Sequence, residues 1–225
     1  MKRILAAIIA AALLLSGCTS ASRPAESAPP TEMPSPSPTP VVTPTPEPEP
    51  ADGELVLVRD YIPGIFIDLK YATTDNFTGQ VIYDSDEAYL RYGTVKKLLC
   101  AQNELSGRGL SLKIWDAYRP VSAQFKLWEI CPNPVYVSDP NNGYSKHSRA
   151  NTVDITLVTD TGKSIPMPSG FDDFTSLADR DYSDVSAEAA ENARLLESVM
   201  VENGFVPYSG EWWHYSDSVA YDVYG

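Results

Sequence analysis

Hydrophobic and polar residues alternate along short stretches of the chain, which is the pattern of a half-buried β-strand. Alternation is present over residues 65–69, 110–114 and 152–159. In the last of these stretches the apolar residues share one face, and Asp154 lies on the opposite face. This stretch predicts a buried strand, and we expect a final strand over residues 212–215.

Apolar residues follow a helical period in three other stretches. Residues 86–106 carry this period and stop at a pair of glycines, as helix C-termini often do. Residues 121–130 follow a proline and predict a shorter helix. Residues 186–203 begin with Ser186, a favoured N-cap residue type, and are followed by Gly204. Three helices are therefore expected.

The expected strands and helices are interspersed without regular alternation, and the sequence contains no visible repeat. This order predicts the α+β class, in which a small, mainly antiparallel sheet has helices packed against it. Residues 53–225 have a suitable length for one such domain.

The N-terminal residues resemble an export signal. Lys2 and Arg3 precede an apolar run over residues 4–15, which is too short for a stable membrane-spanning helix. Small residues then lead to Cys18, in the arrangement of the bacterial lipoprotein lipobox. We expect residues 1–17 to be removed and Cys18 to be lipidated, which would anchor the protein outside the cytoplasm; the alternative is an ordinary cleaved signal.

Residues 18–52 form a linker in which proline recurs every few positions. Of the 19 prolines in the chain, 11 lie between Pro24 and Pro50. The linker has too few apolar residues for a packed core, so we expect it to be disordered. In a polyproline II conformation it would reach on the order of 100 Å.

The chain is acidic, with a formal net charge of −13. Most of this charge belongs to residues 53–225, which carry −11. An acidic surface argues against nucleic acid or an anionic membrane surface as the main partner. Contact with a membrane is expected only through the N-terminal lipid.

Three cysteines are too few for a disulfide framework, and none has the Cys-x-x-Cys spacing of a zinc ribbon. Apart from the expected lipidation site, Cys100 and Cys131 remain. They could form a disulfide in an exported protein, or they could be two free thiols.

The two histidines of the chain both have acidic residues near them in the sequence. Asp154 follows His147 by seven residues, and Glu211 precedes His214 by three. Two imidazoles and one carboxylate are a common ligand set of catalytic zinc, which lowers the pKa of its bound water to about 7. Glu211 would then be the general base. Packed core histidines and an aspartate that caps backbone remain the alternative.

The odd spacing of His147 and Asp154 would place them on opposite faces of one straight strand. For both to bind one metal ion, the chain must turn between them, with His147 in a loop. With two histidines, a site that needs three is excluded.

Five motifs together resemble the zinc D-alanyl-D-alanine dipeptidase family. They occur in the family's order and cover most of the expected domain. The motifs are Asp-Leu-Lys-Tyr-Ala-Thr-Thr-Asp-Asn-Phe-Thr-Gly at 68–79, Trp-Asp-Ala-Tyr-Arg-Pro at 115–120, Ser-x-His with the later aspartate at 145–154, 166–172, and Glu-Trp-Trp-His-Tyr at 211–215.

The resemblance implies a role for each site residue. His147, Asp154 and His214 would bind one Zn²⁺ ion per chain. Glu211 would be the general base and then the acid that protonates the leaving amine, and Arg119 would stabilise the oxyanion.

The resemblance also implies how the two ends of a substrate are held. Ser145 would help to bind its C-terminal carboxylate, Asp172 would pair with its ammonium group, and Tyr71 would line that end. The chain departs from the family pattern at Ala150, where glycine is usual, and at Met167-Pro168. One residue fewer separates Asp154 from Asp172, which affects the loop carrying Asp172.

We therefore expect a lipid-anchored, extracytoplasmic zinc peptidase that cleaves D-Ala-D-Ala to two D-Ala in cell-wall peptide metabolism. One alternative is a D,D-carboxypeptidase that acts on D-Ala-terminated peptidoglycan peptides, which a displaced Asp172 would favour. The other is a non-catalytic wall-peptide binding module, which would be expected to have lost Glu211 or a zinc ligand; all are present.

Overall fold

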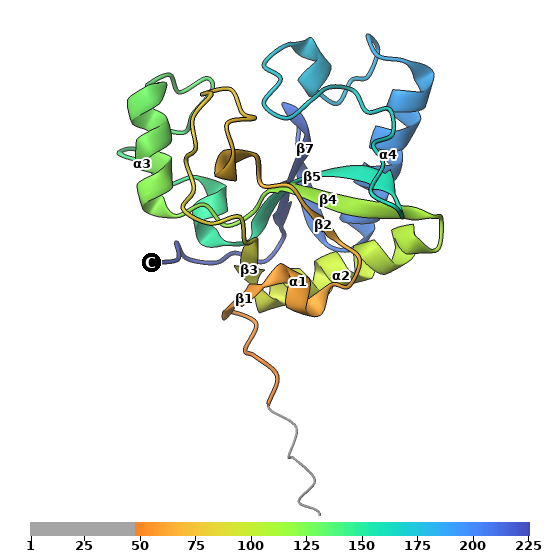
Figure 1. Cartoon of the computed structure of the whole chain (residues 1–225), viewed down its shortest axis with the longest axis horizontal. Helices are drawn as coiled ribbons and strands as arrows, with labels where there is room; N and C mark the ends of the chain where they lie inside the picture. Colours follow the sequence, from red (N-terminus) through yellow and green to blue (C-terminus); the bar gives the residue numbers. More distant parts are fainter. Residues whose placement is uncertain (1–47) are drawn as a thin grey trace, which may run out of the picture. The chain divides into compact units, whose positions relative to one another are not determined.

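A five-stranded mixed sheet is the centre of the structure, in the order β2-β4-β5-β7-β6 (Figure 1). The pairs β4–β5, β5–β7 and β6–β7 are antiparallel, and β2 pairs with β4 in parallel. The prediction of a small, mainly antiparallel sheet is thus confirmed. The strands are β2 (Phe66–Ile67), β4 (Leu110–Asp116), β5 (Thr152–Thr159), β6 (Phe205–Tyr208) and β7 (Glu211–Asp217).

The computed structural model describes residues 48–225, which belong to one compact unit. The expected signal peptide, Cys18 and all but the last residues of the expected linker lie outside the described residues. Among the described residues, none of the helices has the length and apolarity required to span a membrane.

Helices α2 (Tyr92–Ser106) and α4 (Ala187–Glu202) contact the sheet and each other, and α3 (Val121–Ile130) follows β4. The N-cap expected at Ser186 is present, because its Oγ accepts a hydrogen bond from the backbone N–H of Ala189 at 3.2 Å. The remaining elements are short: α1 (Val58–Tyr61), β1 (Leu55–Leu57), β3 (Tyr89–Arg91) and the 3₁₀-helices η1 (Lys70–Ala72), η2 (Lys146–Arg149) and η3 (Ser176–Ala178).

The helix predicted over residues 86–106 begins later than expected. Residues 89–91 form β3, which pairs with β1 in a separate two-stranded antiparallel sheet. Because this pairing joins residues more than thirty positions apart, the local period could not reveal it. The expected strand over residues 65–69 is also shorter, since only Phe66–Ile67 are in strand conformation.

Strand β5 has the predicted bounds and is buried along nearly its whole length. Val153, Ile155 and Leu157 belong to the hydrophobic core, while Asp154 is on the opposite face of the strand. A buried carboxylate is costly without partners. This position therefore indicates a local set of polar contacts.

Cys100 and Cys131 are both free thiols. Cys100 is exposed on α2, and Cys131 is partly buried after α3. Of the two possibilities that the sequence left open, the structure therefore has two free thiols and no disulfide between Cys100 and Cys131.

Ala150 is in the left-handed region, with φ of 58°, at the end of η2. Glycine adopts this conformation without the steric cost that alanine incurs. We expect Ala150→Gly to raise the free energy of unfolding by about 0.5–1 kcal/mol, measured by urea denaturation. As a control, Ala101→Gly in the middle of buried α2 should lower it by about 1 kcal/mol. A loss of stability in both variants would contradict strain at Ala150.

Candidate metal centre and active site

Asp154 and His214 lie directly opposite each other on the antiparallel strands β5 and β7. Opposed residues in such a pair have side chains on the same face at close range. Here the Asp154 Oδ1 atom is 2.9 Å from His214 Nδ1. The sheet register thus brings two of the three expected metal ligands together.

His147 reaches the same point from η2, because the chain turns at Ala150 before it enters β5. Its Nε2 atom is 3.2 Å from Asp154 Oδ2 and 3.4 Å from His214 Nδ1. The turn that the odd spacing required is therefore present.

The three side chains fit a zinc ion. All are buried, and their ligand atoms lie within 4.8 Å of one another. The Nδ1 atom of His147 is 2.9 Å from the carbonyl oxygen of Ala117, a contact that leaves Nε2 as the ligand atom. A set of two imidazoles and one carboxylate is typical of catalytic zinc sites.

The electrostatics of the cluster suit metal binding. Burial lowers the pKa of His214, so that the imidazole is neutral at pH 7. Against the effect of its own burial, Asp154 has a lowered pKa because of His147 and His214. Asp154 is thus ionised and His214 neutral, as metal ligands must be. Against the effect of its burial, Asp154 and Asp116 raise the pKa of His147, so a metal ion that binds there displaces its proton.

Glu211 is the first residue of β7, and its Oε2 atom is 3.4 Å from His214 Nδ1. Burial, together with the charge of Asp154, raises the pKa of Glu211 to about 7. A carboxyl group with such a pKa can both accept and release a proton at neutral pH. Glu211, His214 and Ser145 also line one cavity of about 280 Å³.

Arg119 is buried and held by two partners. Its Nε and Nη2 atoms donate to Asp116 Oδ2 at 3.1 and 2.5 Å, and Nη1 donates to Gln124 Oε1 at 3.0 Å. Asp116 also accepts a hydrogen bond from Tyr83, and it pairs with Asp154 across β4 and β5. This pairing places the end of β4, three residues before Arg119, beside the metal ligand Asp154.

Sequence reasoning missed Asp116, Gln124 and Tyr83 as partners of this arginine. The available signal was that Asp116 belongs to the motif at 115–120, just after the strand predicted over residues 110–114. Gln124 and Tyr83 had no signal of their own, because their contacts depend on the tertiary structure.

Tyr71 and Asp172, which are 101 positions apart, are in direct contact. The Tyr71 hydroxyl donates to Asp172 Oδ2 at 2.9 Å, and the Arg119 guanidinium lies 5.0 Å from the centre of the Tyr71 ring. Burial raises the pKa of Asp172 to about 8, although the hydrogen bond from Tyr71 opposes this shift. The shorter loop before Asp172 has therefore not separated it from Tyr71.

Ser145 is buried and precedes η2 as its N-cap. Its Oγ atom accepts a hydrogen bond from the backbone N–H of His147 at 3.3 Å. Because a hydroxyl that accepts through its oxygen still has a hydrogen to donate, Ser145 can bind an anionic group in the cavity.

The segment η2 is fastened by the C-terminal residues. The backbone N–H of Tyr224 donates to Ser148 O at 2.9 Å, and Arg149 Nη1 donates to Tyr221 O at 2.7 Å. Arg91 on β3 joins this region through Asp222 O at 2.8 Å. The end of the chain thus holds the helix that carries His147.

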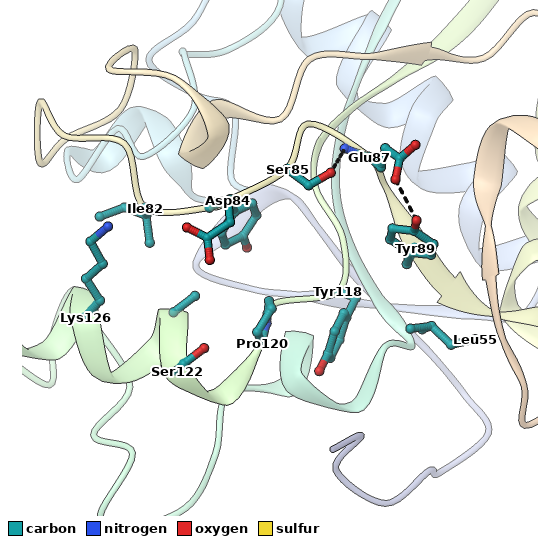
Figure 2. A pocket seen from close by; sticks show the side chains of 12 residues that line it. Leu55, Ile82, Asp84, Ser85, Glu87, Tyr89, Tyr118, Pro120, Ser122 and Lys126 are labelled. Carbon is teal, nitrogen blue, oxygen red and sulfur yellow. Dashed lines mark hydrogen bonds between the residues drawn. The ribbon is translucent and has the colours of Figure 1, made fainter.

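A larger cavity of about 400 Å³ lies elsewhere, between the loop before β3 and the start of α3 (Figure 2). Tyr118, Pro120 and Ser122 line one side of it, and Asp84 points towards them. None of the expected site residues lines it. The expected site residues Ser145, Glu211 and His214 therefore line the smaller of these two cavities, the one of about 280 Å³.

A buried His-Asp-His cluster with an adjacent glutamate on an α+β scaffold is typical of zinc metallopeptidases. The chain belongs to the D-Ala-D-Ala dipeptidase family of peptidases, whose sequence model matches residues 51–222.

Two curated relatives illustrate the relationship. D-alanyl-D-alanine dipeptidase of Escherichia coli K12 is 39% identical over 162 residues, covering 72% of this chain and 83% of the relative. D-alanyl-D-alanine dipeptidase of Enterococcus faecium is 35% identical over 176 residues, covering 69% and 87%. A solved structure of VanYB in complex with D-alanine-D-alanine is 17% identical, with a TM-score of 0.41, and the alignment covers 60% of this chain and 75% of that one.

Proposed function

We propose that the protein is a zinc-dependent dipeptidase that hydrolyses D-Ala-D-Ala to two D-Ala. The observation that carries this proposal is the position of Glu211, 3.4 Å from one ligand of the His147–Asp154–His214 cluster and on the wall of the same cavity. Family membership supports the substrate. The presence of all three ligands and of Glu211 favours an enzyme over a non-catalytic binding module.

In the proposed mechanism His147, Asp154 and His214 would hold a zinc ion, which would supply Lewis acidity and make water nucleophilic at neutral pH. The Glu211 carboxylate takes a proton from the attacking water. It then gives a proton to the nitrogen of the leaving D-Ala, whose bond to the carbonyl carbon breaks.

Arg119 and the residues around it stabilise charge during this reaction. Its guanidinium is fixed by Asp116 and Gln124, so it needs little rearrangement when negative charge develops on the carbonyl oxygen. Fixed donors of this kind are worth about 3–4 kcal/mol in a water-excluded site.

Asp172 and Tyr71 would bind the ammonium group of the dipeptide. A partly buried carboxylate with a raised pKa gains a compensating charge when an ammonium group binds beside it. A longer peptide has a neutral amide at this position and leaves the Asp172 carboxyl group with its hydrogen bond from Tyr71 but without a counter-charge. The contact between Tyr71 and Asp172 therefore favours the dipeptidase over the D,D-carboxypeptidase alternative.

The purified zinc-loaded chain is expected to release D-Ala from D-Ala-D-Ala. A chelator should abolish turnover, and added Zn²⁺ should restore it. The reason is that the His147–Asp154–His214 side chains can bind a Lewis acid but cannot replace one. A pentapeptide that ends in D-Ala-D-Ala is the substrate for comparison, because a D,D-carboxypeptidase would cleave it. Loss of its terminal D-Ala with the dipeptide left intact would show a carboxypeptidase instead.

We also propose that Cys18 is lipidated and anchors the enzyme outside the cytoplasm, where it acts on D-Ala-D-Ala derived from cell-wall peptides. The support is the charged start, the apolar run over residues 4–15 and the small residues before Cys18. Incorporation of labelled fatty acid that persists in Cys18→Ala would refute this anchor.

A further inference from the structure

The cavity beside the candidate metal centre has an uneven distribution of charge. Among the described residues that line it, only Lys146 and Glu211 have charged side chains, apart from the titratable His214. Lys146 is adjacent to Ser145 at the start of η2. The cationic side of the cavity is therefore next to the Ser145 hydroxyl, which the family resemblance assigns to the C-terminal carboxylate of a substrate.

The Lys146 side chain lies along the cavity wall. Its Nζ atom is 5.9 Å from the centre of the Tyr208 ring, and that ring is 5.7 Å from the ring of His214. In the part of the chain that the structure describes, Lys146 forms no ion pair with an acidic side chain within 4.0 Å, so its ammonium group is available to a ligand.

Two arginines also lie near the metal centre, and each already has another role. Arg119 is fixed by Asp116 and Gln124 and stabilises the reacting carbonyl in the proposed function. Arg180 donates to Glu197 Oε2 at 2.9 Å and to the backbone carbonyl oxygen of His214 at 3.2 Å.

The inner part of the site also contains three carboxyl groups, of which Asp154 is held in its ionised form, while the pKa values of Asp172 and Glu211 are raised to about 8 and about 7. Desolvating a substrate carboxylate beside these groups without a cation would be costly.

We infer that Lys146 binds the C-terminal carboxylate of the substrate together with the Ser145 hydroxyl, and so restricts cleavage to peptides with a free C-terminus. This inference rests on the proposed function and adds the residue that determines this specificity. In the proposed function the dipeptide would then have its ammonium end at Asp172 and its carboxylate end at Lys146 and Ser145.

The test compares D-Ala-D-Ala with its C-terminal amide on the zinc-loaded full chain. Lys146→Met removes the charge and leaves an unbranched side chain that is one heavy atom shorter. Because Lys146 is exposed, we expect KM for the acid to rise about twofold to fivefold, with a smaller change in kcat, and the amide to be unaffected. Lys146→Arg should retain the preference for the acid. Lys163→Met, at an exposed lysine outside the cavity, should behave like wild type.

An equal loss with acid and amide, or no change with either, would overturn the inference even if wild type cleaves the dipeptide. The same comparison can be made by calorimetric binding of the two ligands to the zinc-loaded chain. If wild type binds but cleaves neither ligand, the proposed function fails, while the ratio of the two affinities in Lys146→Met still decides the role of Lys146.

Discussion

Replacing Glu211 with alanine is expected to lower kcat for D-Ala-D-Ala by about 10³-fold, within the range for loss of a general acid–base group. The side chain is not part of the three-residue ligand cluster, so the variant should still bind one zinc ion per chain. Release of D-Ala and zinc content by mass spectrometry measure the two properties separately.

Glu191→Ala is a matched control for this variant, since it removes an exposed glutamate from α4. It should leave both turnover and zinc content unchanged. If Glu211→Ala turns over at the wild-type rate, another group is the base. If it loses zinc, Glu211 has a structural role in the metal centre that the geometry does not suggest.

Replacing Asp116 with alanine should have the largest effect on stability. Asp116 is fully buried and accepts bonds from Arg119 and Tyr83, so its removal leaves a buried guanidinium without its counter-charge. Breaking a buried ion pair from one side typically costs about 3–5 kcal/mol. Urea denaturation in the presence of a chelator measures this cost without the contribution of bound zinc.

The double variant Asp116→Ala/Arg119→Ala provides the necessary comparison. Because it removes both charges, it should lose less stability than the sum of the two single variants. Asp160→Ala, at an exposed aspartate, should change the free energy of unfolding by less than about 0.5 kcal/mol. Additive losses would mean that the two side chains do not stabilise each other.

The fold was predictable where the local pattern was long enough. Residues 152–159 show the alternation of a strand and form β5 with the same bounds, and Ser186 caps α4 as expected. The pairing of β1 with β3 was not predictable, because strands of three residues carry too little periodicity and their partners are far apart. This pairing between segments that are far apart in the sequence gives residues 89–91 a strand conformation where the helix was expected.

The candidate site was predictable to the extent that few residues could form it. With two histidines in the chain, His147 and His214 had no competitors, and the structure brings both to Asp154. The partners of Arg119 and the position of Lys146 on the cavity wall depend on how separate segments pack. Neither has a sequence signature, so the geometry was needed to find them.

The bonds from the C-terminal residues to η2 have a consequence for how the site assembles during synthesis. Tyr221 and Tyr224 follow all three metal ligands along the chain, and they fasten the segment that carries His147. The third ligand, His214, comes 60 residues after Asp154. A growing chain that reaches only to the end of β5 therefore has two of the three ligands, and the metal centre becomes complete and fastened only after β7 and the residues that follow it have been added.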